Sequence, residues 1–149
     1  MKFERRISIN CEPEKVFISL RDKDQFQQEP GSPVLLLEKT TPGPVGIGTQ
    51  YREVVQMFPL VKGEILSTIE RYEPPVHLEE SFRGTGMDGN LAYEINLVEE
   101  GTHLIQRETI QFHGLFGLFS SLMGRMLLKA VEARLEGIKK FLESKPAGE

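Results

Sequence analysis

Alternating apolar and polar residues over most of the chain predict a series of β-strands. In the segment Phe3–Ile9, for example, Phe3, Ile7 and Ile9 share one side of an extended chain. Turn-forming Pro and Gly residues separate the later runs, and the short connections predict antiparallel neighbours. The predicted strands are Phe3–Ile9, Val34–Lys39, Gly48–Phe58, Val61–Tyr72, Val76–Arg83, Asn90–Val98 and His103–Phe112, with a Gly-rich loop at Gly84–Gly89.

Helical periodicity replaces the alternation in two places. After the first strand, Pro13 suits a first helical turn and Val16, Phe17 and Leu20 give one apolar stripe. Asp22 is a candidate cap for a second short helix that ends near Gln28, with Phe26 pointing inward.

The C-terminal part, from Leu118 to Glu143, predicts one long helix. Val131, Leu135, Ile138 and Leu142 recur at spacings of four, three and four, which places them on one face. A strongly twisted seven-stranded sheet curls, and a single helix laid in its hollow cannot fill it. Either large side chains fill the gap or a ligand cavity remains. The pattern therefore predicts an α+β chain, residues 1–149, with a single ligand-binding domain.

Composition excludes several classes of protein. The formal net charge of −4 argues against nucleic acid as a main partner, because phosphate binding needs concentrated positive charge. No stretch approaches the roughly 20 apolar residues that span a bilayer, and the N-terminus has no apolar signal core, so we expect a cytoplasmic protein without stable membrane insertion. Cys11 is the only cysteine and is expected to be a half-buried packing residue.

Four local segments resemble a known superfamily. They are Ile7–Leu20 (ISINCEPEKVFISL) followed by Asp22, Gly46–Arg52 (GIGTQYR), Ile69–Pro75 (IERYEPP) followed by Leu78, and Gly101-Thr102. In order and spacing these segments are similar to the START-like, or Bet v 1-like (SRPBCC), superfamily, nearest its bacterial polyketide cyclase/dehydrase and lipid-transport group. The resemblance implies a helix-grip fold: a curved antiparallel sheet, two short helices after the first strand, and a long C-terminal helix over a cavity. It implies a fold more than a function.

Alternation selects the side chains that face this cavity. The apolar residues choose the inner row of each strand: Leu78, Glu80 and Phe82 in the fifth strand, and Leu97 with its alternate neighbours in the sixth. The predicted ligand-binding residues are Tyr51, Glu53, Glu80, Phe82, Leu91, Tyr93, Ile95, Gln106, Glu108, Ile110, Phe112, Leu118, Ser121, Leu122 and Met126.

Three carboxylates in this set stand out. Buried without partners, Glu53, Glu80 and Glu108 would cost several kcal/mol or shift their pKa values upward. One interpretation is a polar end of the cavity that orients a ligand or supplies a general acid or base. The other is that some of the three face solvent, or pair with Arg52 or Arg107 through a shift of register.

The segment Gly114–Gly124 is apolar nearly all round, and we expect Gly117, Ser121 and Gly124 to form a shallow strip on one helical face. Packing against the sheet, a ligand portal, a dimer contact and transient membrane docking are all compatible with it.

The sequence contains no recognisable metal-binding, nucleotide-binding or hydrolase motif, so we expect no cofactor and no metal. The favoured function is binding of an apolar or amphipathic small molecule, such as a lipid, isoprenoid or aromatic polyketide, by a carrier or sensor. One alternative is a cyclase/dehydratase in which Tyr51, Glu53, Glu80 or Glu108 transfers protons. Another is a protein-interaction module. The chain is expected to be a monomer or a homodimer.

Overall fold

Seven strands form one antiparallel sheet. The computed structural model describes residues 1–25 and 32–144, with Phe58 described by its backbone alone. Along the sheet the strand order is β1-β7-β6-β5-β4-β3-β2, so the first strand lies beside the last. The strands are β1 (Lys2–Ile9), β2 (Val34–Lys39), β3 (Gln50–Phe58), β4 (Val61–Glu73), β5 (His77–Gly84), β6 (Met87–Val98) and β7 (Gly101–Phe112).

Two helical segments follow β1. Helix α1 (Pro13–Arg21) begins with its proline in the first turn and buries Val16, Phe17 and Leu20, as its apolar stripe predicts. In the described part of the predicted second helix, the structure has the short 3₁₀ turn η1 (Lys23–Gln25). The Asp22 carboxylate pairs with Arg21 at 2.8 Å and does not cap this turn through its side chain. The predicted positions of Phe26 and Gln28 lie outside the described residues.

The C-terminal helical region is divided. A short helix, α2 (Leu115–Leu118), is separated from the long helix α3 (Ser120–Glu143) by Phe119. The predicted strip of small residues is therefore wrong, because Gly117 belongs to α2 whereas Ser121 and Gly124 belong to α3. Gly124 is buried and packs against Met1, where a Cβ would come within 2.9 Å of the Met1 sulfur.

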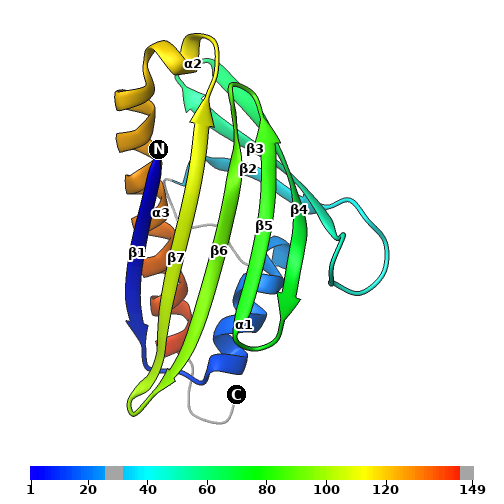
Figure 1. The fold of residues 1–149 in the computed structure, drawn as a ribbon, viewed down its shortest axis with the longest axis vertical. Coiled ribbons are helices and arrows are strands. Elements are labelled where there is room, and N and C mark those ends of the chain that lie inside the picture. The colour runs from blue at the N-terminus through cyan, green and yellow to red at the C-terminus, as the bar shows by residue number, and fades with distance from the viewer. Residues whose placement is uncertain (26–31, 145–149) are drawn as a thin grey trace.

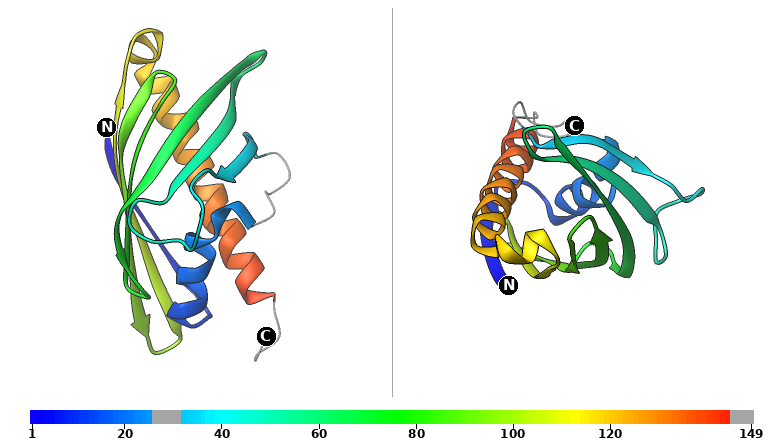
Figure 2. Two further views of the ribbon diagram at one scale, coloured as in Figure 1. Left: turned by 90° about the vertical axis from the view of Figure 1, so that its right-hand side faces the viewer. Right: turned by 90° about the horizontal axis from the view of Figure 1, so that it is seen from above.

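The sheet is strongly curved and α3 crosses its concave side (Figures 1 and 2). Helix α3 contacts the sheet mainly at the edge strand β1, and it also touches α1 and α2. Seen from above, the strands wrap round from β1 to β2, with α1 inside the lower end (Figure 2). The predicted α+β helix-grip fold is therefore confirmed.

Two apolar clusters occupy the concave side. The lower cluster joins α1 and the second half of α3 to the sheet, through residues such as Phe17, Leu104 and Leu135. The upper cluster contains Val55, Met57, Met87 and Ile110. Phe3, Phe82 and Leu127 touch both clusters.

Two predictions at the ends of strands need correction. The Gly84–Gly89 loop is shorter than expected, because β5 extends to Gly84 and β6 starts at Met87, which leaves a tight turn. Gly86 in this turn has φ +72°, and the Phe116 ring occupies the place a Cβ would need. Leu97 lies on the inner row but is exposed, since it extends past the lower cluster.

Candidate functional site

A band of polar side chains crosses the concave face between much of the lower cluster and the upper cluster. Along β3, Glu53 lies between Tyr51 of the lower cluster and Val55 of the upper one. The inward rows of β4, β5 and β7 also change from apolar to polar, at Ser67, at Glu80, and at Gln106 and Glu108. We call this band the polar belt, which comprises Lys23, Glu53, Ser67, Glu80, Tyr93, Gln106, Glu108 and Arg134.

One half of the belt is internally paired. Lys23 of η1 enters the concave side, and its Nζ lies 2.9 Å from the Glu80 carboxylate and 3.3 Å from the Ser67 hydroxyl. The same ammonium group lies 4.6 Å from the centre of the Tyr51 ring. The Tyr51 hydroxyl donates a hydrogen bond of 2.7 Å to the Arg21 carbonyl, and burial raises the pKa of this phenol. Glu80 and Tyr51 therefore already have partners, and their contacts hold η1 against the sheet.

The other half of the belt lacks partners among the described residues. Tyr93 Oη, Gln106 Oε1 and Glu108 Oε2 are buried and make no hydrogen bond there. Tyr93 and Gln106 stand opposite each other on β6 and β7, and Glu108 is the next inward residue along β7. A buried polar group without a partner costs about 1–3 kcal/mol, so this side-by-side group is a costly feature of the fold.

Arg134 faces this unpartnered group from α3. It follows Val131 by three residues and precedes Ile138 by four, so it lies beside the apolar stripe of the helix. The pKa of Arg134 is raised, chiefly by Tyr93 and also by Glu53, Glu80 and Glu108, while burial opposes the charge. Within residues 1–25 and 32–144, Arg134 forms no ion pair within 4.0 Å.

The Arg134 side chain is exposed to solvent. Its charge nevertheless acts on Tyr93 and on the nearby glutamates, so Arg134 lies within electrostatic reach of the polar belt. A guanidinium group presents five N–H donors and does not lose its proton in proteins. Arg134 therefore brings a permanent positive charge to the concave side of the sheet.

Burial also shifts the titration of the acids that Arg134 faces. It raises the pKa of Glu108 to about 7, with Arg134 opposing and Glu80 and Glu53 adding to the shift. It likewise raises the pKa of Tyr93 to about 12, again against the influence of Arg134. Near neutral pH, Tyr93 is thus a hydrogen-bond donor and Glu108 exchanges its proton readily.

The structure distributes the predicted site residues over two regions. Tyr51, Glu53, Glu80, Phe82, Leu91, Tyr93, Ile95, Gln106, Glu108, Ile110 and Phe112 are buried or half-buried, with their alternate positions on the concave face. Leu118, Ser121, Leu122 and Met126 are exposed near the start of α3. That the residues of either region bind a ligand remains a prediction.

Sequence reasoning missed Lys23 and Arg134. Arg134 had a signal, because a charged residue beside a helical apolar stripe faces the same neighbours as the stripe. Lys23 had none, since η1 is too short for periodicity to orient its side chains. The suggested pairing of the acids with Arg52 or Arg107 is wrong: Arg52 pairs with Glu38 and Glu64, and Arg107 with Glu4 and Glu94.

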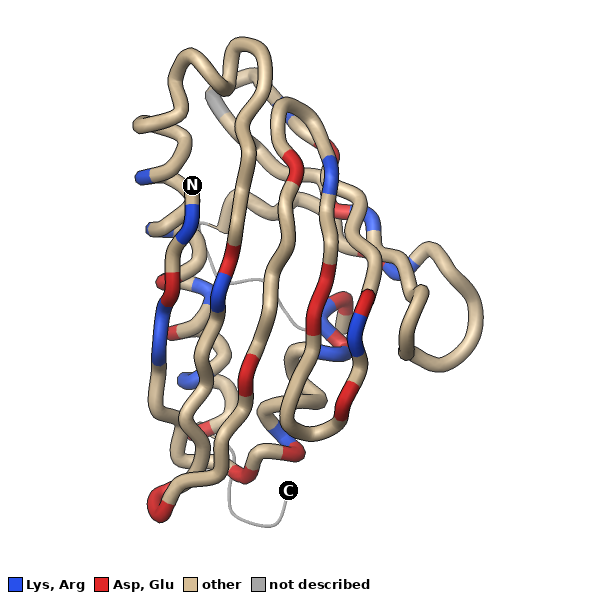
Figure 3. The backbone as a smooth tube through the Cα atoms, viewed as in Figure 1, with Lys and Arg blue, Asp and Glu red and all other residues tan. Residues whose placement is uncertain are grey.

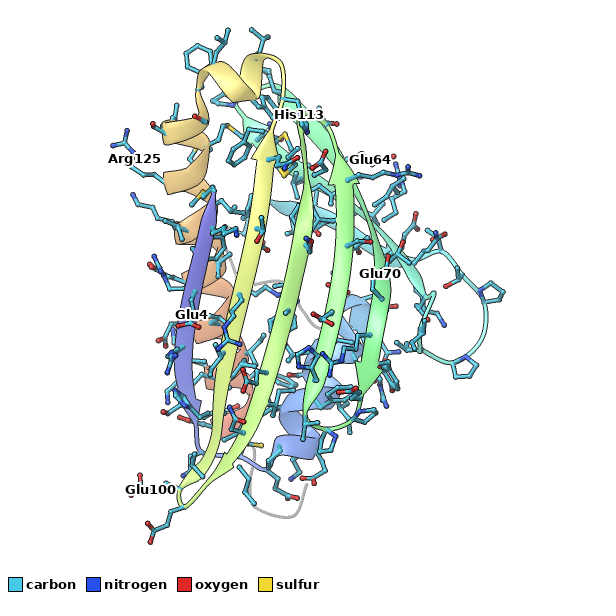
Figure 4. All side chains as sticks on the ribbon, viewed as in Figure 1. Glu4, Glu64, Glu70, Glu100, His113 and Arg125 are labelled. Atoms are coloured by element: carbon cyan, nitrogen blue, oxygen red, sulfur yellow. The ribbon has the colours of Figure 1, made fainter. Side chains whose placement is uncertain are left out.

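Outside the polar belt, the polar side chains on the outer face of the sheet already have partners. The outer face of the sheet has a depression whose lining includes Glu4, Glu70 and Arg107, and Figure 4 shows Glu4 and Glu70 on this face. They are already partnered, as in the 2.6 Å hydrogen bond from Ser81 to Glu70. Among the described residues, no group of three or more His, Cys, Asp or Glu side chains is placed to hold a metal ion.

Comparison with known proteins agrees with this architecture. Residues 1–143 match the family described as "Polyketide cyclase / dehydrase and lipid transport". None of the curated proteins matches the chain in sequence.

Solved structures share the fold at low sequence identity. Ara h 8.0201 superimposes with a TM-score of 0.77 at 13% identity, over 97% of this chain and 99% of that one. For TTHA0849 from Thermus thermophilus the TM-score is 0.70 at 20% identity, over 97% of each chain. A START superfamily protein from Mycobacterium smegmatis gives 0.62 at 13% identity, over 92% of this chain and 98% of that one.

Proposed function

From the premise that the chain belongs to the polyketide cyclase/dehydrase and lipid transport family, we propose that it carries or senses an amphipathic small molecule in the cytoplasm. The apolar body of the ligand lies between α3 and the concave face of the sheet, and its polar group meets the unpartnered half of the polar belt. The observation that carries the proposal is the group of Tyr93, Gln106 and Glu108, buried without partners and facing Arg134. Lipids, isoprenoids and aromatic polyketides all fit this description.

The belt matches a ligand that bears an oxygen atom. Arg134 and Tyr93 supply donors for a carbonyl or carboxylate oxygen, and Gln106 and Glu108 supply acceptors for a hydroxyl group. A bound ligand would restore hydrogen bonds whose loss costs about 1–3 kcal/mol for each buried group. The apolar clusters on either side of the belt would gain roughly 25 cal/mol for each Å² of ligand surface buried.

Native mass spectrometry of freshly purified protein tests for a copurified ligand, and titration with a fluorescent long-chain fatty acid and with anilinonaphthalene sulfonate tests for uptake. We expect Arg134→Gln to weaken uptake of the fatty acid at least tenfold, or about 1.4 kcal/mol. Arg125→Gln is the matched control, because Arg125 is on the same helix and points away from the sheet (Figure 4). If no small molecule copurifies and neither probe binds, the proposal is wrong.

A second candidate function is proton-transfer catalysis of the cyclase/dehydratase kind. It is favoured by the pKa of Glu108, which burial raises to about 7, the range in which a general acid or base works best. Of the residues predicted for this role, Glu80 and Tyr51 are engaged by Lys23 and Arg21, so Glu108 is the better candidate. For an enzyme, Glu108→Gln should abolish turnover of a linear poly-β-ketone thioester while binding persists. Equal turnover by Glu108→Gln would exclude the role.

A further inference from the structure

We propose that the upper end of the molecule docks on the surface of an anionic lipid bilayer. The docking tip consists of two projections: the β3–β4 turn with Leu60 and Val61, and the α2 region with Leu115, Leu118, Phe119 and Leu122. Both projections lie at the same end of the molecule (Figures 1 and 2). Docking at this tip is independent of the ligand proposed for the concave face, and it would bring the upper end of the fold to a membrane.

Large apolar side chains are unusually exposed at this tip. The exposed fraction is 101% for Leu60, 78% for Leu118, 70% for Leu115 and 56% for Phe119. Single exposed apolar residues are common, but a group of them at one end of a molecule marks an interaction site. These side chains gain little from packing within the chain.

The backbone at Leu60 strengthens this point. Its φ is +68°, in the left-handed region where glycine or asparagine is favoured and a side chain such as leucine costs about 1–2 kcal/mol. A fully exposed leucine in that conformation stabilises neither the turn nor the core. Its presence is explained if Leu60 inserts into an apolar phase outside the protein.

Among the described residues, the unpaired charge around the tip is positive, because the nearby acids have partners: Asp88 lies 2.7 Å from His113 and Glu64 lies 2.7 Å from Arg52. From Thr109 to Val131 the chain has no acidic residue, whereas it has Arg125 and Lys129, although the whole chain has a net charge of −4. Figure 3 shows the α2 region and the start of α3 without red segments. Lys62 adds a positive charge two residues after Leu60. Basic residues near an anionic leaflet contribute about 1 kcal/mol each.

A second copy of the chain fits this tip less well. In a symmetric dimer the same patch meets itself, so the positive charges of Arg125 and Lys129 would face a patch of the same sign. The apolar residues also lie on two separate projections, the β3–β4 turn and the α2 region (Figure 2). Among the described helices, none is long and apolar enough to cross a membrane, so the proposed contact is peripheral.

Co-sedimentation with vesicles tests the docking. We expect the protein to bind vesicles of three parts phosphatidylcholine to one part phosphatidylglycerol, and to bind pure phosphatidylcholine and high-salt samples more weakly. Leu60→Gln with Leu118→Gln should reduce binding at least tenfold. Leu97→Gln should not, because Leu97 is 77% exposed at the opposite end of the sheet. Removing the charge of Arg125 or Lys129 should reduce anionic binding about fivefold each.

Three results would overturn the proposal. The first is no binding to either vesicle, and the second is equal loss of binding in Leu97→Gln. The third is a dimer in sedimentation velocity that Leu118→Gln dissociates, which would identify a second copy as the occupant. Circular dichroism and thermal unfolding establish that the variants fold. Uptake of soluble fatty acid, measured without vesicles, separates this outcome from the ligand proposal.

Discussion

At the scale of single residues, the unpartnered half of the polar belt destabilises the protein in the absence of ligand. Glu108 and Gln106 are inward neighbours on β7, between the buried apolar residues Leu104 and Ile110. Replacing them with apolar residues would remove buried polar atoms that lack partners among the described residues. Sites that reduce stability in this way are where proteins hold binding and catalytic groups.

Glu108 makes the stability of the protein depend on pH. Because its folded-state pKa is raised from 4.5 to about 7, the folded protein holds more protons than the unfolded chain between these values. Stability should therefore fall as pH rises from about 4.5 to about 7. Glu108→Gln should remove this loss and stabilise the protein above pH 7 by up to about 3 kcal/mol.

Urea unfolding at pH 5 and pH 8 measures this effect. The glutamine side chain of the Glu108→Gln variant remains polar and carries no charge, so the two proteins should differ mainly at pH 8. Glu100→Gln, in the exposed β6–β7 turn (Figure 4), is the control and should follow the wild type at both values. A difference between wild type and Glu108→Gln that is the same at pH 5 and pH 8 would contradict the assignment.

Prediction from sequence succeeded for residues whose orientation a strand fixes. Gln106 and Glu108 were placed inward by their neighbours Leu104 and Ile110, and all four are buried. The partner of each acid depends on segments far away in the chain, so alternation within one strand could not predict it. The Lys23–Glu80 pair is the clearest case, because it joins η1 to β5.

At the scale of elements, the Lys23–Glu80 pair holds η1 on the sheet. Both side chains are buried, and the ion pair measures 2.9 Å. Removing one partner of a buried pair leaves an uncompensated charge and typically costs roughly 3–5 kcal/mol in the free energy of unfolding. Lys23→Met should therefore destabilise the protein by about 3 kcal/mol.

Chemical denaturation of Lys23→Met and Lys15→Met tests the role of this pair. Lys15 pairs with Glu12 at 3.7 Å near the surface, so its loss should cost less than about 1 kcal/mol. Adding Glu80→Gln to Lys23→Met should recover part of the stability, because it removes the unpaired carboxylate. Equal effects of the two lysine substitutions would show that η1 is held by other contacts.

The ends of helices and strands could be predicted where the pattern of apolar and polar residues changes along the chain. They could not be predicted where the sequence is uniformly apolar. The strands alternate, so their limits differ from expectation by a few residues. The break at Phe119 lies in a segment that is apolar on all sides. No change in hydrophobic periodicity marks the break, so the sequence could not predict it. The turn between β5 and β6 depends on contact between Gly86 and Phe116, which are remote in sequence.

At the scale of the whole molecule, the fold separates a polar outer face from an inner face with two apolar clusters. The backbone of α3 lies closest to β1, and its apolar stripe packs into the lower cluster on the concave face. That arrangement leaves the polar belt between helix and sheet, and it leaves the docking tip at one end. The family and the fold were predictable from the order of elements, whereas the chemistry of the belt required the three-dimensional structure.

The central claim is that a ligand occupies the space between α3 and the sheet at the level of the belt. The most direct test is NMR of the protein with labelled Ile, Leu and Val methyl groups in complex with ¹³C-labelled palmitate. The account predicts contacts from the ligand to the methyl groups of Leu91, Ile110 and Leu127, and none to Leu97. Contacts confined to Leu60, Leu115 and Leu118 would contradict it.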